Sequence, residues 1–176
     1  MDGEEGCKMA GRIFTLLPIK LNATDREFVE TYLDEAGLFL FNQMSLFDQK
    51  HAVAAARVLA TQELMDNRLN QRRLVQAALL HDCGKVKGEI AWFLRPLVAV
   101  IRKFFPRRRE KWAARGESAL SHALYVDLHH PSRGAYLAES LGLEPELVSL
   151  IKHHHDPLTG NQDPELVLLQ SVARKG

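Results

Sequence analysis

The residues best suited to chemistry in this chain are histidines and an aspartate, gathered in a few short stretches. The most informative stretch is the adjacent pair His81-Asp82, which directly follows the apolar residues 77–80. Two titratable side chains at the edge of a core helix cost free energy unless they are paired or bound to a metal. The pair therefore favours a metal centre.

Further histidines follow the same pattern at His51, at His130 and in the cluster 153–156 (HHHD). Each falls near an end of an expected helix, so the side chains could converge at one end of a helical bundle. A single histidine such as His51 or His130 is more often a structural polar residue, and only the combination favours a site. Imidazole and carboxylate suit a divalent ion, namely Mn, Fe, Ni, Co, Zn or Mg, without deciding between them.

Hydrophobic spacing is helical throughout, and no stretch alternates as a strand would. We expect a helix from Thr24 or Asp25 to Gly37, and an alanine-rich helix over about 49–65 capped by Asp48. A third should be capped by Asn70 and stopped by Gly84, a residue that tolerates positive φ. Prolines open three more helices, at Pro131, Pro145 and Pro164. The sequence thus predicts an all-α fold, a single compact bundle of five or more helices.

Bulk properties exclude several classes of protein. The length of 176 residues fits one domain that needs no disulfides. The two cysteines, Cys7 and Cys83, cannot form a disulfide framework, and the acidic N-terminus does not resemble a signal peptide. We therefore expect a cytoplasmic protein. The net charge of +1 provides no global attraction to nucleic acid or membranes.

One segment departs from the regular pattern. Residues 90–105 are apolar but too short, and too interrupted by basic residues, to span a bilayer. Four interpretations stay open: an amphipathic helix packed on the bundle, a cationic lid over a phosphorylated substrate, a peripheral membrane contact through residues 90–115, and a nucleic-acid contact, the least favoured partner. Eight basic residues lie between positions 95 and 115, interleaved with aromatic ones: Arg95, Arg102, Lys103, Arg107, Arg108, Arg109, Lys111 and Arg115.

Residues 79–85 (LLHDCGK) resemble the HDxGK signature of the HD superfamily of metal-dependent phosphohydrolases. Residues 48–53 (DQKHAV) resemble the first motif of that family, in which a histidine opens a helix. Residues 129–135 (HHPSRGA) resemble the third motif, and residues 151–156 (IKHHHD) the fourth. Any one match is weak, but all four occur in order and span most of the chain.

The resemblance implies an HD-like domain over residues 45–176 with an insertion at about 88–120, preceded by an N-terminal helical extension over 1–44. It implies hydrolysis of a phosphomonoester or phosphodiester in a nucleotide or another small phosphorylated compound. It implies catalytic roles for Asp82 and Lys85, and substrate contacts at Lys85, His130 and His155. The implied metal ligands are His51, His81, Asp82, His130 and His154.

The sequence also departs from the family. Ala173 stands where the family usually has an aspartate ligand near the end of a later helix, and no carboxylate follows Glu165. The GYP motif of the branch that degrades cyclic dinucleotides is missing after Asp156. An alternative is therefore a degenerate HD domain that serves signalling or interaction without catalysis. The sequence indicates neither the substrate nor the oligomeric state.

Overall fold

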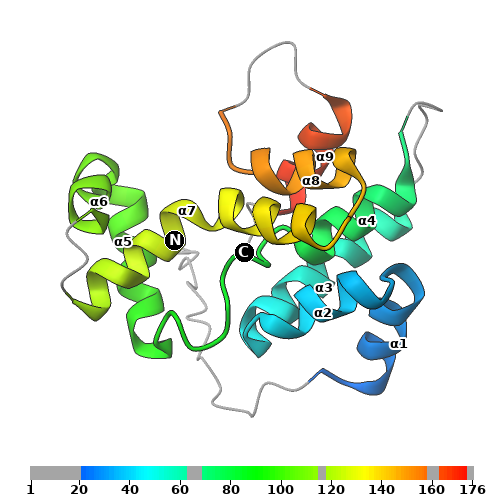
Figure 1. Ribbon diagram of the computed structural model, residues 1–176, viewed down its shortest axis with the longest axis horizontal. Helices are drawn as coiled ribbons and strands as arrows, with labels where there is room; N and C mark the ends of the chain where they lie inside the picture. Colours follow the sequence, from blue (N-terminus) through cyan, green and yellow to red (C-terminus); the bar gives the residue numbers. More distant parts are fainter. Residues whose placement is uncertain (1–20, 63–68, 115–117, 158–162, 174–176) are drawn as a thin grey trace, which may run out of the picture.

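The described part of the polypeptide is mostly helical. A computed structural model describes residues 21–62, 69–114, 118–157 and 163–173 (Figure 1). Within these ranges the chain has nine α-helices, one 3-10 helix and no strand, and the prediction of an all-α fold is confirmed. The elements are α1 (Ala23–Tyr32), α2 (Glu35–Gln43), α3 (Leu46–Thr61), α4 (Gln71–Leu80), η1 (Trp92–Leu94), α5 (Arg95–Phe104), α6 (Pro106–Ala113), α7 (Ala119–Ser140), α8 (Pro145–His153) and α9 (Pro164–Ala173).

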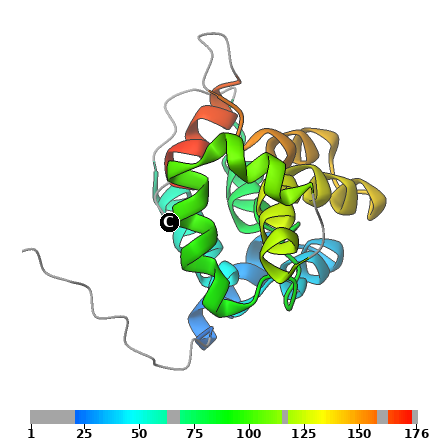
Figure 2. The same cartoon turned by 90° about the vertical axis from the view of Figure 1, so that its left-hand side faces the viewer.

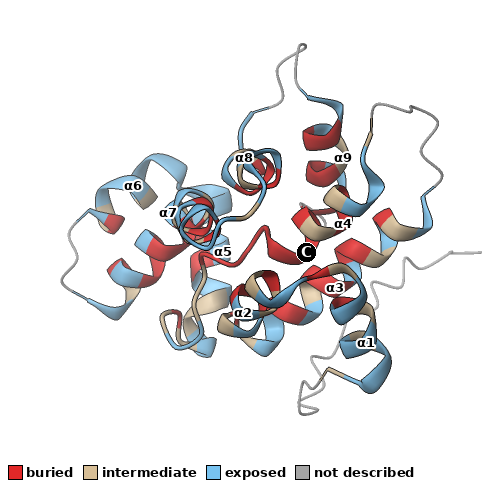
Figure 3. Ribbon diagram, turned by 45° about the vertical axis from the view of Figure 1, so that its right-hand side comes forward, coloured by how far each residue is buried: buried red, intermediate tan, exposed pale blue. Residues whose placement is uncertain are grey.

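The centre of the bundle is the pair α3 and α4. These two helices pack on each other, and α9 contacts both of them, while α1, α2 and α8 contact α4. Residues 77–80 of α4 are fully buried, and α3 faces its neighbours with small side chains such as Ala52 and Ala56. Small side chains let helix axes approach closely. Figure 3 shows the buried residues on the inward sides of the central helices.

A second, smaller lobe lies at the far end of the long helix α7. There α5 and α6 pack on each other and on α7 (Figure 1). Their inner residues Val98, Ile101 and Ala113 form a separate core with Leu124 and others on α7. This lobe corresponds to part of the expected insertion. No helix in the described ranges has both the length and the apolar character needed to cross a membrane.

Several helix boundaries follow the sequence signals. The side chain of Asn70 accepts the hydrogen bond from the backbone N–H of Arg73 and caps α4, as predicted. Pro145 and Pro164 are the first residues of α8 and α9. Gly142 ends α7 with a φ of 77°, a backbone conformation that suits glycine.

Other boundaries were predicted wrongly. Asn22, rather than Thr24 or Asp25, caps α1, and Gly37 lies inside α2 instead of ending the first helix. Ser45 caps α3, so Asp48 lies in its first turn. The helix ends at Thr61 rather than near residue 65, and residues 63–68 lie outside the described ranges.

Two further corrections concern the site. Pro131 does not open a helix, because α7 continues through it for a full 22 residues. His130 is therefore in the middle of a helix, not at an end. Gly84 does not have a positive φ, and α4 already ends at Leu80. Its role is close packing against the backbone of α7.

The predicted division into an extension (1–44) and an HD-like domain (45–176) stays a prediction. Within the described part of that extension, α1 and α2 pack against α4. Residues 1–20 lie outside the described ranges.

Candidate metal centre

Four helices bring the predicted site residues together. His51 lies in the second turn of α3, His81 caps the C-terminal end of α4, and Asp82 follows it. His130 comes from the middle of α7, and His154 caps the C-terminal end of α8. The ring of His81 lies 5.3 Å from that of His51 and 5.1 Å from that of His154, measured between centroids.

The ligand atoms fall into two adjoining groups. His51, His81 and Asp82 form one, and His130, His154 and His155 form the other; within each group the ligand atoms all lie within 4.8 Å of one another. The two groups touch, because Nε2 of His130 lies 3.2 Å from Oδ1 of Asp82. The arrangement therefore offers room for one or two ions.

Backbone carbonyls orient three of the rings in the same way. Nδ1 of each ring lies within hydrogen-bonding distance of the carbonyl oxygen three residues earlier, at 2.9 Å for His81, 2.9 Å for His130 and 2.6 Å for His154. A carbonyl oxygen only accepts, so each Nδ1 carries the proton and donates it. In a neutral ring the other nitrogen, Nε2, then has a free lone pair, which is the form that binds metals.

Pro131 explains how α7 can supply such a carbonyl in its interior. In a regular helix the N–H of residue 131 would donate to the carbonyl oxygen of Asp127, but proline has no N–H. The ring of His130 makes that hydrogen bond instead. The His-Pro dipeptide, read from the sequence as a helix start, thus orients a histidine inside a helix.

Two glycines let α7 approach the turn after α4. A Cβ atom on Gly84 would overlap the carbonyl oxygen of His130, and one on Gly134 would lie 3.0 Å from Sγ of Cys83. A side chain is therefore excluded at Gly84, and one at Gly134 requires its neighbours to shift. The close approach brings His130 within reach of Asp82.

Asp82 is ionised in this environment. Burial alone would raise the pKa of its carboxyl group, but the positive charge of Lys85, followed by the contributions of His81 and His130, holds that pKa well below its usual range. Nζ of Lys85 lies 2.7 Å from Oδ1 of Asp82, and the lysine side chain is 12% exposed. A buried carboxylate of this kind is a suitable ligand for a cation.

Four of the histidines in these groups favour the neutral form. Burial is the main cause that lowers the pKa of His51, of His130 and, most strongly, of His154. The pKa of His155 falls to about 3, first because its ring is desolvated and then because of the charges of His130 and Lys85. His155 packs on the rings of His130 and His154 yet is the one solvent-exposed member of the two groups.

Two observations indicate that the residues fit a metal ion. Nε2 of His130 faces Nε2 of His154 at 3.2 Å, and their lone pairs repel unless a proton or a cation lies between them. The lowered pKa values disfavour the proton. In addition, Oδ1 of Asp82 accepts no well-formed hydrogen bond from any described residue, despite the nearby charges. Its contact with Nζ of Lys85 is an ion pair, so this carboxylate oxygen keeps lone pairs that a metal ion could use.

Residues 49–173 match the HD domain family. The chain belongs to the HD domain family. The match covers most of the chain and includes all four histidine stretches, which confirms the predicted superfamily. No curated protein and no solved structure matches the chain.

The HD domain of this chain lacks any ligand from α9. Ala173 is buried at the end of that helix, and no α9 residue belongs to either group of ligand atoms in the described ranges. Instead, Gln170 donates from Nε2 to the carbonyl oxygens of His153 and Asp156, at 3.2 and 3.0 Å. Gln170 thereby holds the turn that carries His154 and His155. The sequence carries no signal for this role, because the carbonyl groups that Gln170 contacts lie 17 and 14 residues earlier in the chain.

A second contact missed in the sequence connects the insertion to the site. Arg95 donates to both carboxylate oxygens of Asp48, at 2.8 Å each, and to Oγ of Ser45. Asp48 lies one turn before His51 on α3.

His153, by contrast, points away from the two groups and pairs with Asp156 at the surface, 2.7 Å from Nδ1 to Oδ2.

Proposed function

We propose that this HD domain hydrolyses the phosphoester bond of a nucleotide or another small phosphorylated compound with the help of a divalent metal. The observation that carries the proposal is the Lys85–Asp82 contact beside two adjoining groups of metal-binding side chains. An ionised carboxylate, several imidazoles and a cation lie close together there, which supports the proposal.

Each side chain has a role in this scheme. His51, His81 and Asp82 would hold one ion, while His130, His154 and His155 would hold a second or contact the substrate. A bound divalent ion supplies a water of lowered pKa and polarises the phosphoryl group. His155 is exposed to solvent, so a substrate that approaches the site could contact its ring.

Lys85 would stabilise the charge that develops on the phosphoryl oxygens. Fixed positive charge in a desolvated site stabilises such a transition state without reorganisation. Asp82 holds the ammonium group in place at 2.7 Å, so the lysine is positioned before the substrate arrives. Lys85 is partly exposed, which leaves it able to contact a phosphate.

A turnover assay tests the proposal. The purified chain would be offered p-nitrophenyl phosphate, bis-p-nitrophenyl phosphate and nucleoside monophosphates with Mn²⁺, Co²⁺, Ni²⁺ or Mg²⁺. We expect metal-stimulated turnover that falls by about a hundredfold or more in Asp82→Asn and in His130→Ala. His129→Ala is the matched control, because His129 is exposed and stacks on Tyr125 rather than on the site. Absence of turnover with every metal would contradict the proposal.

The second candidate is a non-catalytic HD domain. It is favoured by the methyl group of Ala173, where relatives are expected to provide a carboxylate. Loss of a carboxylate lowers both metal affinity and negative charge at a site. This candidate predicts a folded chain that binds metal weakly or not at all and shows no turnover. A gain of metal affinity and turnover in Ala173→Asp would support it.

A further inference from the structure

The outer face of α5 carries an apolar stripe that no described residue covers. Leu97, Val100 and Phe104 recur at intervals of three and four residues, which places them on one side of α5, and Phe93 lies just before them in η1. The exposed fractions of Phe93, Leu97, Val100 and Phe104 are 61%, 43%, 47% and 64%, and that of the neighbouring Trp92 is 79%. Such a contiguous apolar surface marks a site of interaction.

The opposite side of α5 is fixed to the protein. Val98 and Ile101 are buried in the small core against α7. Arg95 pairs with Asp48 at 2.8 Å, and Arg102 pairs with Asp127 at 3.2 Å. These inward contacts determine which side of the helix faces solvent, so the apolar stripe cannot rotate inward.

Positive charge accompanies the stripe. Glu110 is the one acid between residues 95 and 114. Arg109 faces inward and pairs with Asp127 at 2.7 Å. The remaining four cations, which are exposed and form no ion pair with a described residue, are Lys103, Arg107, Arg108 and Lys111.

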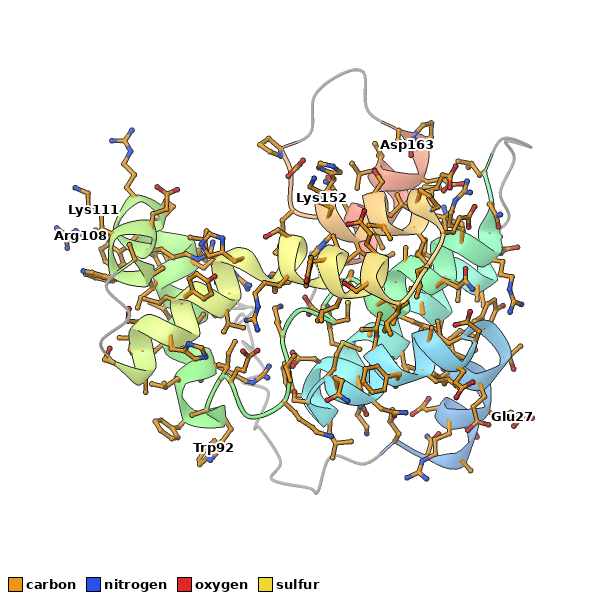
Figure 4. The ribbon with its side chains drawn as sticks, in the orientation of Figure 1. Glu27, Trp92, Arg108, Lys111, Lys152 and Asp163 are labelled. Carbon is orange, nitrogen blue, oxygen red and sulfur yellow. The ribbon has the colours of Figure 1, made fainter. Side chains whose placement is uncertain are left out.

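The figures show how this surface is presented. Trp92 lies at one end of the lobe, and the side chains of Arg108 and Lys111 extend from the other end (Figure 4). When the left-hand side of Figure 1 faces the viewer, the green helices α5 and α6 stand in front of the rest of the chain (Figure 2). A flat partner could thus reach them without meeting the bundle.

We propose that the outer face of α5 and α6 docks on an anionic lipid bilayer. Amphipathic helices with aromatic and aliphatic residues on one face and Lys or Arg beside them bind in the interface plane. Anionic headgroups complement the four cations. Nucleic acid would use the arginines and the aromatic rings, but it provides no apolar surface for Leu97 and Val100.

Vesicle binding tests the proposal with the full chain. Co-sedimentation with 1:1 phosphatidylglycerol–phosphatidylcholine vesicles should be strong at low salt and weak with phosphatidylcholine alone. Each Lys or Arg near an anionic surface contributes about fivefold, so Arg107→Gln/Arg108→Gln/Lys111→Gln should weaken binding roughly a hundredfold. Arg26→Gln/Lys50→Gln/Lys152→Gln is the matched control and should bind as the native chain does, since its exposed cations lie on α1, α3 and α8.

The apolar part of the proposal has its own readout. Trp112→Phe leaves Trp92 as the one tryptophan, whose emission should shift to the blue with anionic vesicles. Phe93→Ser/Phe104→Ser, two exposed positions that can change without altering the core, should reduce binding even at low salt. The proposal would be overturned if the native chain bound vesicles and neither the triple variant of α6 nor the Phe93→Ser/Phe104→Ser variant bound them more weakly. It would also be overturned if the native chain did not bind anionic vesicles, if it bound oligonucleotides more tightly than vesicles, or if the same residues joined two copies of the chain instead.

Discussion

Gly84 lies directly against the carbonyl oxygen of His130, in a contact with no space for a side chain. The contact joins the turn after α4 to the middle of α7, and so it brings Asp82 and His130 together. We predict that Gly84→Ala lowers the free energy of unfolding by about 3 kcal/mol or more, because rigid backbone atoms must move. Urea denaturation measures this.

Gly134→Ala is the matched comparison. Its Cβ would meet Sγ of Cys83 at 3.0 Å, the backbone nitrogen of Gly84 at 3.1 Å and Cγ2 of Ile151 at 3.2 Å, so each neighbour must move by only a few tenths of an ångström. A Cβ on Gly84, by contrast, would overlap the carbonyl oxygen of His130. Alanine also gains about 1 kcal/mol of helix propensity over glycine inside α7. Gly134→Ala should therefore lower the free energy of unfolding by less than Gly84→Ala does. Equal losses would contradict the packing argument.

Pro131→Ala should separate stability from metal binding. The new N–H can donate to the carbonyl oxygen of Asp127 and compete with the ring of His130. A proline inside a helix costs about 3 kcal/mol, so the variant should be as stable as the native chain or more so. Loss of the contact that orients a ligand lowers metal affinity by about 10- to 100-fold. Thermal melting and metal titration calorimetry check the two effects; unchanged affinity would refute the assigned role of Pro131.

The sequence predicted those parts of the fold that depend on local chemistry. Asn70 caps a helix and Pro164 opens one because caps and first-turn prolines act within a single turn. Pro131 was placed wrongly because its cost in a helix is offset by a ring hydrogen bond that the sequence pattern does not display. Gly84 was read as a helix stop because its neighbour, α7, is distant in sequence.

The same limit applies to the candidate site. The ordered histidine stretches identified His81 and Asp82, since their residue types and spacing are visible in the chain. Contacts such as Arg95 with Asp48 and Gln170 with the turn after α8 depend on tertiary packing. Their residue types are common on any helix, and no spacing rule pairs them.

Stability of the metal-free chain should fall in acid. The folded pKa values of His130 and His154 lie below the ordinary value of 6.5, so between those values the unfolded chain binds more protons. The two histidines make their full contribution to the free energy of unfolding above about pH 6.5. Below that pH the contribution decreases, with a slope of up to about 1.4 kcal/mol per pH unit for each group. Asp82, whose folded pKa is also lowered, acts in the same direction below its ordinary 3.8.

Urea denaturation in EDTA between pH 7.5 and 4.5 measures this slope. His154→Gln should reduce it, whereas His153→Gln, a change at the surface, should leave it as in the native chain. A free energy of unfolding that stays constant from pH 7.5 to 5 would show that the buried histidines are not held neutral.

Lys85→Met should separate catalysis from metal binding. The variant removes the charge 2.7 Å from Asp82 but retains all six candidate ligands. We predict that kcat falls by about a hundredfold or more, as for loss of one electrostatic contact in a transition state. Metal affinity should persist or rise, because the carboxylate loses a competing cation. A variant that loses metal together with activity would place Lys85 in the support of the ligands instead.

We propose above all that His81 and Asp82 share a divalent metal ion with the surrounding histidines. The most direct measurement is anomalous X-ray diffraction from crystals of the native chain grown with Mn²⁺. We predict an anomalous peak in contact with Nε2 of His81 and the carboxylate of Asp82. A refined structure with saturating Mn²⁺ and no peak between α3, α4, α7 and α8 would contradict the account.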